Sequence, residues 1–264
     1  MQDVEERYRK RYLDLLFNEQ VKKNFVVRAK ILQAVRSFLE KEGFIEVETP
    51  ILQPLYGGAE AKPFTTHLNA FDMKMYLRIA PELYLKRLIV GGFEKVYEIG
   101  RVFRNEGVDR LHNPDFTMLE FYWAYADYKD NMKLTERFLT SVVKEVLGKT
   151  KFTYEGKEVS LKTPWPRVEY AELLRKHAGV DYDSLSRDAL AKKANELGIK
   201  VEKRAPKYQI ADAIYKSHVR PKIWDPTFVI HHPAGSIPLA KPLDGNPAKL
   251  GTFQLVLAGG WELI

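Results

Sequence analysis

The sequence lacks cysteine altogether, which excludes disulfide bonds and cysteine nucleophiles. It also lacks the run of ~20 apolar residues that a membrane-spanning helix needs, and its first stretch, MQDVEERYRKRYLDLL, is too charged for a secretory signal. No glycine-rich loop of the P-loop or dinucleotide-binding type is present, which disfavours the parallel-sheet nucleotide-binding folds. Together these absences favour a globular protein of the reducing cytoplasm with no membrane partner.

What the sequence does contain is an excess of positive charge. Its 264 residues carry a formal net charge of +7, and 45% of them are hydrophobic and 29% charged. A basic surface attracts anionic partners such as nucleic acid, but a solvated face that binds nothing has the same composition. The charge therefore leaves both interpretations open.

Hydrophobic patterning divides the chain into four predicted segments. These are a helical linker over residues 1–24, a core over 25–150, a helical insertion or lobe over 151–226, and returning core strands over 227–264. The apolar residues of the linker are expected to pack against the main body as a helix; they are Tyr8, Tyr12, Leu13, Leu15 and Leu16. Within the core, Pro81 predicts the start of a helix that Gly91 and Gly92 end.

The most informative stretch is a predicted hairpin, in which residues 95–104 and 116–125 form two strands. Strand side chains alternate between faces, so Glu98 and Arg104 share one face of the first strand. On the second strand one face is shared by Phe116, Met118, Glu120 and Tyr122. A buried charge in such a sheet must be paired or bound to a ligand, because an unpaired one is too costly.

Two interpretations of these charges are possible. One is a structural ion pair between Arg104 and Glu120. The other is a nucleotide-phosphate site, in which Arg104 binds phosphate and Phe116 offers a flat face to a purine. The connecting loop favours the second interpretation because it is crowded with hydrogen-bonding groups, namely Arg104, Asn105, Glu106, Arg110, His112 and Asn113.

The residues FRNEG and RLHNPDFTMLEFYWAYADY, which run through this hairpin, closely resemble motif 2 of the class II aminoacyl-tRNA synthetases. EGFIEVETPIL, which contains Pro50, resembles motif 1, and RYRKRYLDLL resembles the linker before the catalytic domain of lysyl-tRNA synthetases. The stretch from Gly57 to Ile99 is similar to the lysine enzymes throughout. The resemblance covers almost the whole chain, but it is patchy between Lys151 and Trp224.

This resemblance implies an α+β fold, with an antiparallel sheet flanked by helices. It implies a ligase that activates L-lysine with ATP and Mg²⁺ and transfers it to tRNA(Lys). It also implies a cytoplasmic homodimer, joined through motif 1 around Pro50.

The resemblance implies roles for individual residues as well. Arg104 would bind the α-phosphate of ATP and the lysine carboxylate, and Phe116 would stack on the adenine. Glu106 and His112 would contact the adenine end and the outer phosphates. The lysine site would comprise Gly58, Glu82, Arg104, Glu120 and Tyr122. Carboxylates and a phenol suit an ammonium group, which has three donors to satisfy.

The sequence departs from the family pattern in three respects. The amino-terminal anticodon-binding domain is absent, and so is motif 3, which predicts a catalytic fold that is incomplete at its carboxyl end. Glu262 matches one metal-binding carboxylate of the family, whereas Gln254 stands in place of the other. The side-chain carbonyl of Gln254 can still bind Mg²⁺, but it is a neutral ligand. We therefore expect weak or no aminoacylation by the 264 residues alone.

Two rival functions remain. A lysyl-transferase paralogue that modifies an elongation factor would share the ATP chemistry without binding tRNA, although Ala80 and the amino-terminal linker look more like the tRNA enzymes. The other rival is a non-catalytic binding module derived from a synthetase. His231 and His232 suggest a metal pair, but adjacent strand residues point to opposite faces, which favours a structural role.

Overall fold

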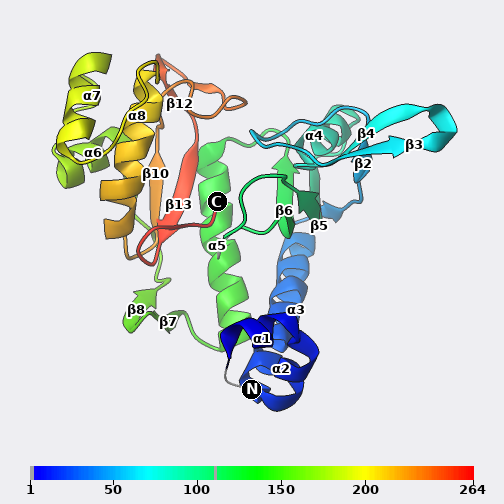
Figure 1. Ribbon diagram of the computed structural model, residues 1–264. Coiled ribbons are helices and arrows are strands. Elements are labelled where there is room, and N and C mark those ends of the chain that lie inside the picture. Colours follow the sequence, from blue (N-terminus) through cyan, green and yellow to red (C-terminus); the bar gives the residue numbers. More distant parts are fainter. Residues whose placement is uncertain (1–2, 110–111) are drawn as a thin grey trace. The chain divides into compact units, whose positions relative to one another are not determined.

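A computed structural model describes residues 3–109 and 112–264, so Arg110 of the predicted loop lies outside the described residues. The chain forms two compact units, Met1–Ala126 and Asp127–Ile264 (Figure 1). No helix in the described ranges combines the length and apolar character that crossing a membrane requires. The predicted antiparallel sheets with flanking helices are present in both units.

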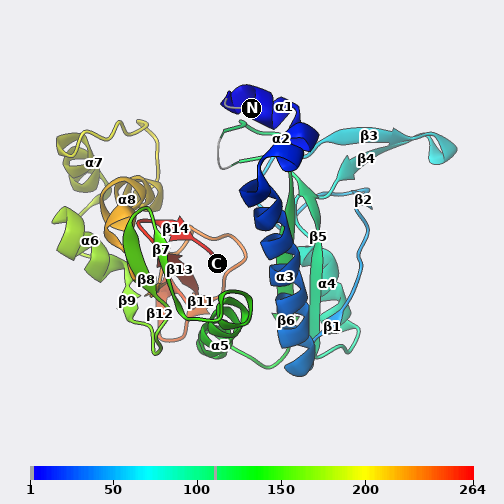
Figure 2. The ribbon, with the colours of Figure 1, turned by 90° about the horizontal axis from the view of Figure 1, so that it is seen from below.

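The first unit is built on a three-stranded sheet with the order β1–β5–β6. β5 (Lys95–Phe103) and β6 (Asp115–Trp123) form the predicted antiparallel hairpin, and β1 (Ile45–Glu46) joins β5 in parallel. Two helices, α3 (Glu19–Lys41) and α4 (Glu82–Val90), lie along this sheet (Figure 2). The α4 helix confirms the prediction from Pro81, which caps its amino end, and Gly91 caps its carboxyl end.

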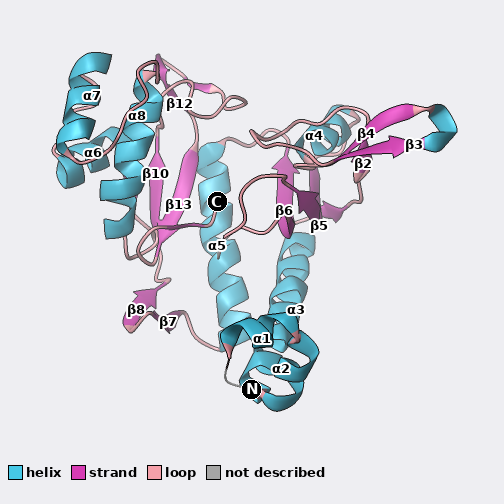
Figure 3. Cartoon of the chain, viewed as in Figure 1, coloured by secondary structure: helices cyan, strands magenta, loops and turns pink. Residues whose placement is uncertain are grey.

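The remaining elements of this unit are α1 (Val4–Arg9), α2 (Arg11–Phe17), β2 (Leu52–Gln53), β3 (Thr65–Leu68), the 3-10 helix η1 (Asn69–Phe71) and β4 (Met73–Leu77). β2, β4 and β3 form a second sheet, and Figure 3 shows the β3–β4 hairpin extending to the right, with the short helix η1 at its tip.

The two helices cover opposite faces of the central hairpin. Arg28 of α3 donates a hydrogen bond to Thr117, whereas Lys86 of α4 lies over the ring of Tyr122. These two β6 residues are separated by an odd number of positions and therefore point to opposite faces. The even-numbered face, which carries Glu120, is thus the α4 face.

The strand register shows that the structural alternative for Arg104 is wrong. Glu98 stands opposite Glu120, and Arg104 follows the end of β5, where its N–H donates to the Pro114 carbonyl at 2.9 Å. Arg104 therefore lies opposite the start of β6, several residues before Glu120. In the described part of the chain, no ion pair joins Arg104 and Glu120. Glu98 pairs instead with Arg78, which the sequence analysis did not single out.

Arg78 and Glu98 form a buried ion pair under the sheet. Their side chains are 1% and 4% exposed. Thr49 donates a hydrogen bond to Glu98 at 2.6 Å, and Arg78 donates to the Arg101 carbonyl at 2.8 Å. Gly100 leaves the space for this guanidinium, because a Cβ atom there would lie 2.0 Å from a terminal nitrogen of Arg78.

The first helices differ from the expected packing. α1 has no buried residue, and Tyr8, Tyr12 and Leu16 are 69%, 70% and 73% exposed, so the prediction of packing against the main body is wrong for these three, whereas Leu13 and Leu15 are half-buried. The buried residue of α2 is the polar Asp14. Its carboxylate accepts hydrogen bonds from Arg7 at 2.8 Å and from Asn18 at 2.5 Å, and from Arg11. Charge pairing, rather than apolar burial, holds these two helices together.

We expect Asp14→Asn to loosen α2, since the amide cannot accept the same charge-assisted bonds. Burial raises the pKa of Asp14, but the hydrogen bonds from Arg7 and Asn18 outweigh it and hold the pKa below its ordinary value. The stabilisation is therefore present above the unfolded-state pKa and is lost as pH falls through the folded-state pKa. Amide hydrogen exchange over residues 11–17 should become about tenfold faster at neutral pH. The exposed Glu19→Gln is the control, and equal exchange in both variants would contradict the prediction.

The second unit is built on a four-stranded sheet with the order β14–β13–β10–β9. Its helices are α5 (Tyr128–Leu147), α6 (Tyr170–Ala178), α7 (Arg187–Glu196), α8 (Lys207–Ile214), the π-helix η2 (Tyr215–Val219) and the 3-10 helix η3 (Arg220–Lys222). Its strands are β7 (Lys151–Tyr154), β8 (Lys157–Ser160), β9 (Arg167–Glu169), β10 (Thr227–Ile230), β11 (Pro242–Leu243), β12 (Asn246–Leu250), β13 (Phe253–Leu257) and β14 (Trp261–Glu262).

This sheet is buried on both faces. Val229 and Val256 pack on one face against α6, α7, α8 and η2, and Figure 3 shows these helices grouped together. Phe228 and Leu255 pack on the other face with Met132 of α5. β9, which pairs in parallel with β10, lies within the stretch predicted to be helical, because three residues are too few to show a strand period.

Candidate functional site

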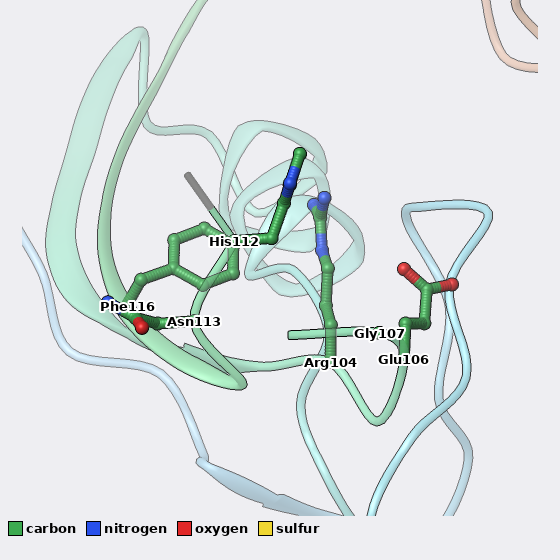
Figure 4. Close-up of a pocket in the computed structure, with 6 residues that line it drawn as sticks. All are labelled: Arg104, Glu106, Gly107, His112, Asn113 and Phe116. Atoms are coloured by element: carbon green, nitrogen blue, oxygen red, sulfur yellow. The ribbon is translucent and has the colours of Figure 1, made fainter. Parts of the chain in front are cut away.

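The loop between β5 and β6 forms an open pocket of about 290 Å³. Its lining residues are Arg104, Glu106, Gly107, His112, Asn113 and Phe116. Figure 4 shows the side chains of Arg104, Glu106 and His112 extending toward the same side of the loop. The four residues predicted to bind ATP therefore lie around one pocket.

Arg104 is the centre of this pocket. Its guanidinium carbon lies 5.3 Å from the centroid of the Phe116 ring, within the range of a cation–π contact. Among the described residues, its buried Nε has no hydrogen-bond partner. A buried N–H without an acceptor costs free energy, so an acceptor group here would stabilise this position of the guanidinium. The planar guanidinium could donate paired hydrogen bonds to a phosphate or a carboxylate.

His112 is held by a residue that the sequence analysis missed. Asp109 accepts a hydrogen bond from the His112 backbone N–H at 2.9 Å, and its carboxylate lies 2.8 Å from Nδ1 of the imidazole. Both side chains are exposed, so this contact orients the ring rather than burying it. An aspartate three residues before a loop histidine is the available sequence signal, since such side chains commonly close turns on the backbone.

A second group of predicted residues lies on the α4 face of the same hairpin. Tyr122 donates a hydrogen bond from its hydroxyl to Glu120 at 3.2 Å. Gly58 has a φ of +88°, and a Cβ atom there would lie 2.9 Å from the Cβ of Glu82. The backbone at Gly58 therefore approaches Glu82 more closely than any other residue type allows. Lys86, which the sequence analysis missed, donates to Glu82 at 2.5 Å.

The electrostatics of this group favour a cationic ligand. Burial, with a further contribution from the charge of Glu82, raises the pKa of Glu120 to about 7. Burial and the charge of Glu120 also raise the pKa of Tyr122, so its hydroxyl stays a neutral donor and acceptor. A cation that entered beside Glu120 would relieve the cost of its buried negative charge.

Glu262 and Gln254, the predicted metal ligands, belong to the second unit and lie beside each other on β14 and β13. Gln254 donates to Glu262 at 2.9 Å, and Arg220 donates to the other carboxylate oxygen at 3.2 Å. The amide oxygen of Gln254 faces Nε2 of His232 at 3.0 Å. One carboxylate, already bound by a guanidinium, does not fit the hard oxygen set that Mg²⁺ prefers. Among the described residues, moreover, no group of three His, Cys, Asp or Glu side chains could hold a metal ion.

The two adjacent histidines point apart, as predicted. His231 lies 3.0 Å from both the Tyr128 hydroxyl and a Glu169 oxygen, whereas His232 turns toward Gln254. Burial lowers the pKa of His232 to about 4, so this imidazole is neutral at physiological pH. The histidines therefore serve two separate hydrogen-bond networks.

A protein-family model described as tRNA synthetases class II (D, K and N) matches residues 3–264. The lysine–tRNA ligase of Carboxydothermus hydrogenoformans is 50% identical over 258 residues, which are 97% of this chain and 53% of that protein. The lysine–tRNA ligase of Pelotomaculum thermopropionicum is 50% identical over 262 residues, which are 98% of this chain and 52% of that protein. That of Moorella thermoacetica is 48% identical over 260 residues, with 98% and 53% covered. The chain thus spans about half the length of the curated relatives it matches.

Proposed function

Because this chain belongs to the class II tRNA synthetases of the D, K and N group, we propose that it activates L-lysine with ATP and transfers it to tRNA(Lys). The position of Arg104 carries the proposal, since its guanidinium lies beside the flat ring of Phe116 on an open pocket and its buried Nε has no acceptor among the described residues. Relatives that are named lysine–tRNA ligases support lysine as the amino acid. The proposed reaction uses ATP and tRNA, so we expect the protein in the cytoplasm.

In the proposed first step, a carboxylate oxygen of lysine attacks the α-phosphorus of ATP. The new O–P bond gives lysyl-adenylate, and the bond to the β-phosphate breaks and releases pyrophosphate. Arg104 would neutralise the α-phosphate and orient the lysine carboxylate, while Phe116 would stack on the adenine. Glu106 and His112 would contact the adenine end and the outer phosphates. The ribose hydroxyl at the end of the tRNA then displaces AMP from the adenylate.

The amino groups of lysine would be held by Glu82, Glu120 and Tyr122, with Gly58 providing the close backbone. Lysine brings ammonium groups to a pocket whose Glu120 carboxylate is costly to ionise when the pocket is empty. A substrate without the matching ammonium leaves these acceptors unpaired, which is how a polar pocket rejects it. The test is titration of L-lysine, L-ornithine and L-norleucine into the protein; equal affinity for norleucine and lysine would contradict the proposal.

Lysine affinity should depend on pH through Glu120. The pKa of Glu120 in the empty pocket is about 7, so the carboxyl is protonated below that pH and cannot hold an ammonium group. We expect the association constant to be highest near pH 8, where Glu120 is ionised and the amino groups of lysine are still largely protonated, and to fall about tenfold per unit well below pH 7. Glu120→Gln should bind lysine on the order of 100-fold more weakly at pH 8, with no such slope. Calorimetric titration between pH 5.5 and 8.5 measures both, and a wild-type affinity that does not change with pH would contradict the assignment.

We also propose that the protein forms a homodimer through the segment around Pro50. Ile45, Ile51 and Leu52 on either side of it are 52%, 42% and 46% exposed, which is a high exposure for three neighbouring aliphatic residues. Covering them with the same segment of a second copy would remove apolar surface from water. Ile51→Glu should shift the sedimentation coefficient to that of a monomer, whereas Val90→Glu, at an exposed site on α4, should not.

A further inference from the structure

Lys86 places an ammonium group beside Glu82, one of the residues that are proposed to bind lysine. It lies one helical turn after Glu82, and its Nζ donates to the Glu82 carboxylate at 2.5 Å. The same Nζ lies 5.9 Å from the centroid of the Tyr122 ring. Glutamate followed by lysine four positions later is common on exposed helices, where it contributes little. Here, however, the Glu82 side chain is only 16% exposed, so the carboxylate is largely removed from water.

The charges in the pocket show what this ammonium does. The site contains two carboxylates, Glu82 and Glu120, and the charge of Glu82 raises the pKa of Glu120. The other charged or titratable groups that act on Glu120 are Tyr122, Arg104 and Glu98, and Glu98 is already paired with Arg78. Without Lys86, two uncompensated carboxylates would share one partly buried site, and one of them would take up a proton.

Substrate lysine carries two ammonium groups, and Arg104 is the proposed partner of its carboxylate. The two ammonium groups of the substrate can pair with Glu82 and Glu120 only after Lys86 has left Glu82. The Lys86 side chain is 43% exposed, and its four-carbon stem is flexible, so its Nζ can swing into solvent without a backbone movement. The opposite side of Glu82 is closed by the backbone of Gly58.

We propose that Lys86 is a tethered counter-ion, which occupies the ammonium position at Glu82 in the empty pocket and is displaced by an amino group of the substrate. This inference rests on the proposed function. It makes Lys86 a specificity-determining residue, because a ligand that enters at Glu82 must supply a cation there to compensate for the ion pair that it breaks. A ligand with a single ammonium group either pairs with Glu120 and leaves Lys86 in place, or displaces Lys86 and leaves Glu120 unpaired.

The decisive variant is Lys86→Met, which keeps the length of the stem and removes the charge. The matched control is Lys86→Arg, which keeps the charge. In Lys86→Met the substrate has no internal cation to displace, so lysine should bind three- to tenfold more tightly at pH 8.5 in calorimetric titrations. The uncompensated Glu82 should also move the pH at which half of the affinity is lost upward by about one unit. Lys86→Arg should reproduce the wild-type profile.

A second measurement does not require the substrate. Carboxyl ¹³C NMR of the ligand-free chain should show Glu120 titrating at higher pH in Lys86→Met than in the wild type. An unchanged Glu120 titration together with an unchanged lysine profile would overturn the inference, provided that circular dichroism shows both proteins folded. Wild-type protein that does not bind L-lysine at pH 8.5 would instead overturn the proposed function, and this inference with it.

Discussion

Arg104→Ala is expected to weaken ATP binding on the order of 100-fold or more, because the guanidinium supplies charge-assisted bonds that water cannot replace in a partly buried pocket. In the proposed site this side chain would meet both phosphate and purine, since its Nε has no hydrogen-bond partner among the described residues and its guanidinium contacts Phe116. In a protein of the relatives' full length, the same change should abolish lysine-dependent ATP–pyrophosphate exchange. Arg104→Lys should recover little of either property, because an ammonium lacks the planar fork.

The matched control is Arg101→Ala, on the same hairpin. Arg101 is exposed and pairs with Asp115 at 3.3 Å, so its removal tests the effect of losing one positive charge near the loop. We expect at most a few-fold change in ATP affinity in this variant, since surface ion pairs contribute little and are screened by salt. Near-normal ATP binding by Arg104→Ala, or equal losses in both variants, would overturn the nucleotide assignment.

Gly100→Ala is expected to cause the largest loss of stability. The added methyl carbon would lie 2.0 Å from an Arg78 nitrogen and 3.0 Å from a Glu98 oxygen, in a place with no solvent to receive a displaced side chain. Separating the buried pair leaves uncompensated charges, so the free energy of unfolding should fall by about 3–5 kcal/mol. Chemical denaturation followed by circular dichroism measures this change.

Gly107→Ala controls for the general effect of replacing glycine. Among the described residues, no atom lies within 4 Å of a Cβ atom at Gly107, and its backbone does not have a positive φ. Its effect on stability should therefore stay within about 1 kcal/mol in either direction. A Gly100→Ala protein as stable as Gly107→Ala would show that the Arg78–Glu98 pair can rearrange, and the account of this glycine as space for a guanidinium would be wrong.

Local patterns were sufficient where the chain contacts itself within a few residues. The β5–β6 hairpin, the α4 helix between Pro81 and Gly91, and β10 were all predicted from periodicity and from helix-ending residues. Most of the predicted ATP-site residues lie in a single loop, so a hairpin alone brings them together. By contrast, periodicity did not predict short strands such as β9. It predicted a helix at α1, but not that this helix is exposed.

The sequence by itself determined which groups the candidate site contains: the guanidinium of Arg104, the ring of Phe116, and the carboxylates and phenol of the proposed lysine site. Only the tertiary structure decided how those charges are partnered. Strand register places Glu120 opposite Glu98 and not in an ion pair with Arg104, and Arg78 reaches Glu98 through the space left by Gly100. The physical reason is that pairing of buried charge depends on which distant segments exclude water together, and no local pattern records that. Lys86 lies between these cases, because its spacing from Glu82 was visible, but its place in the proposed lysine site was not.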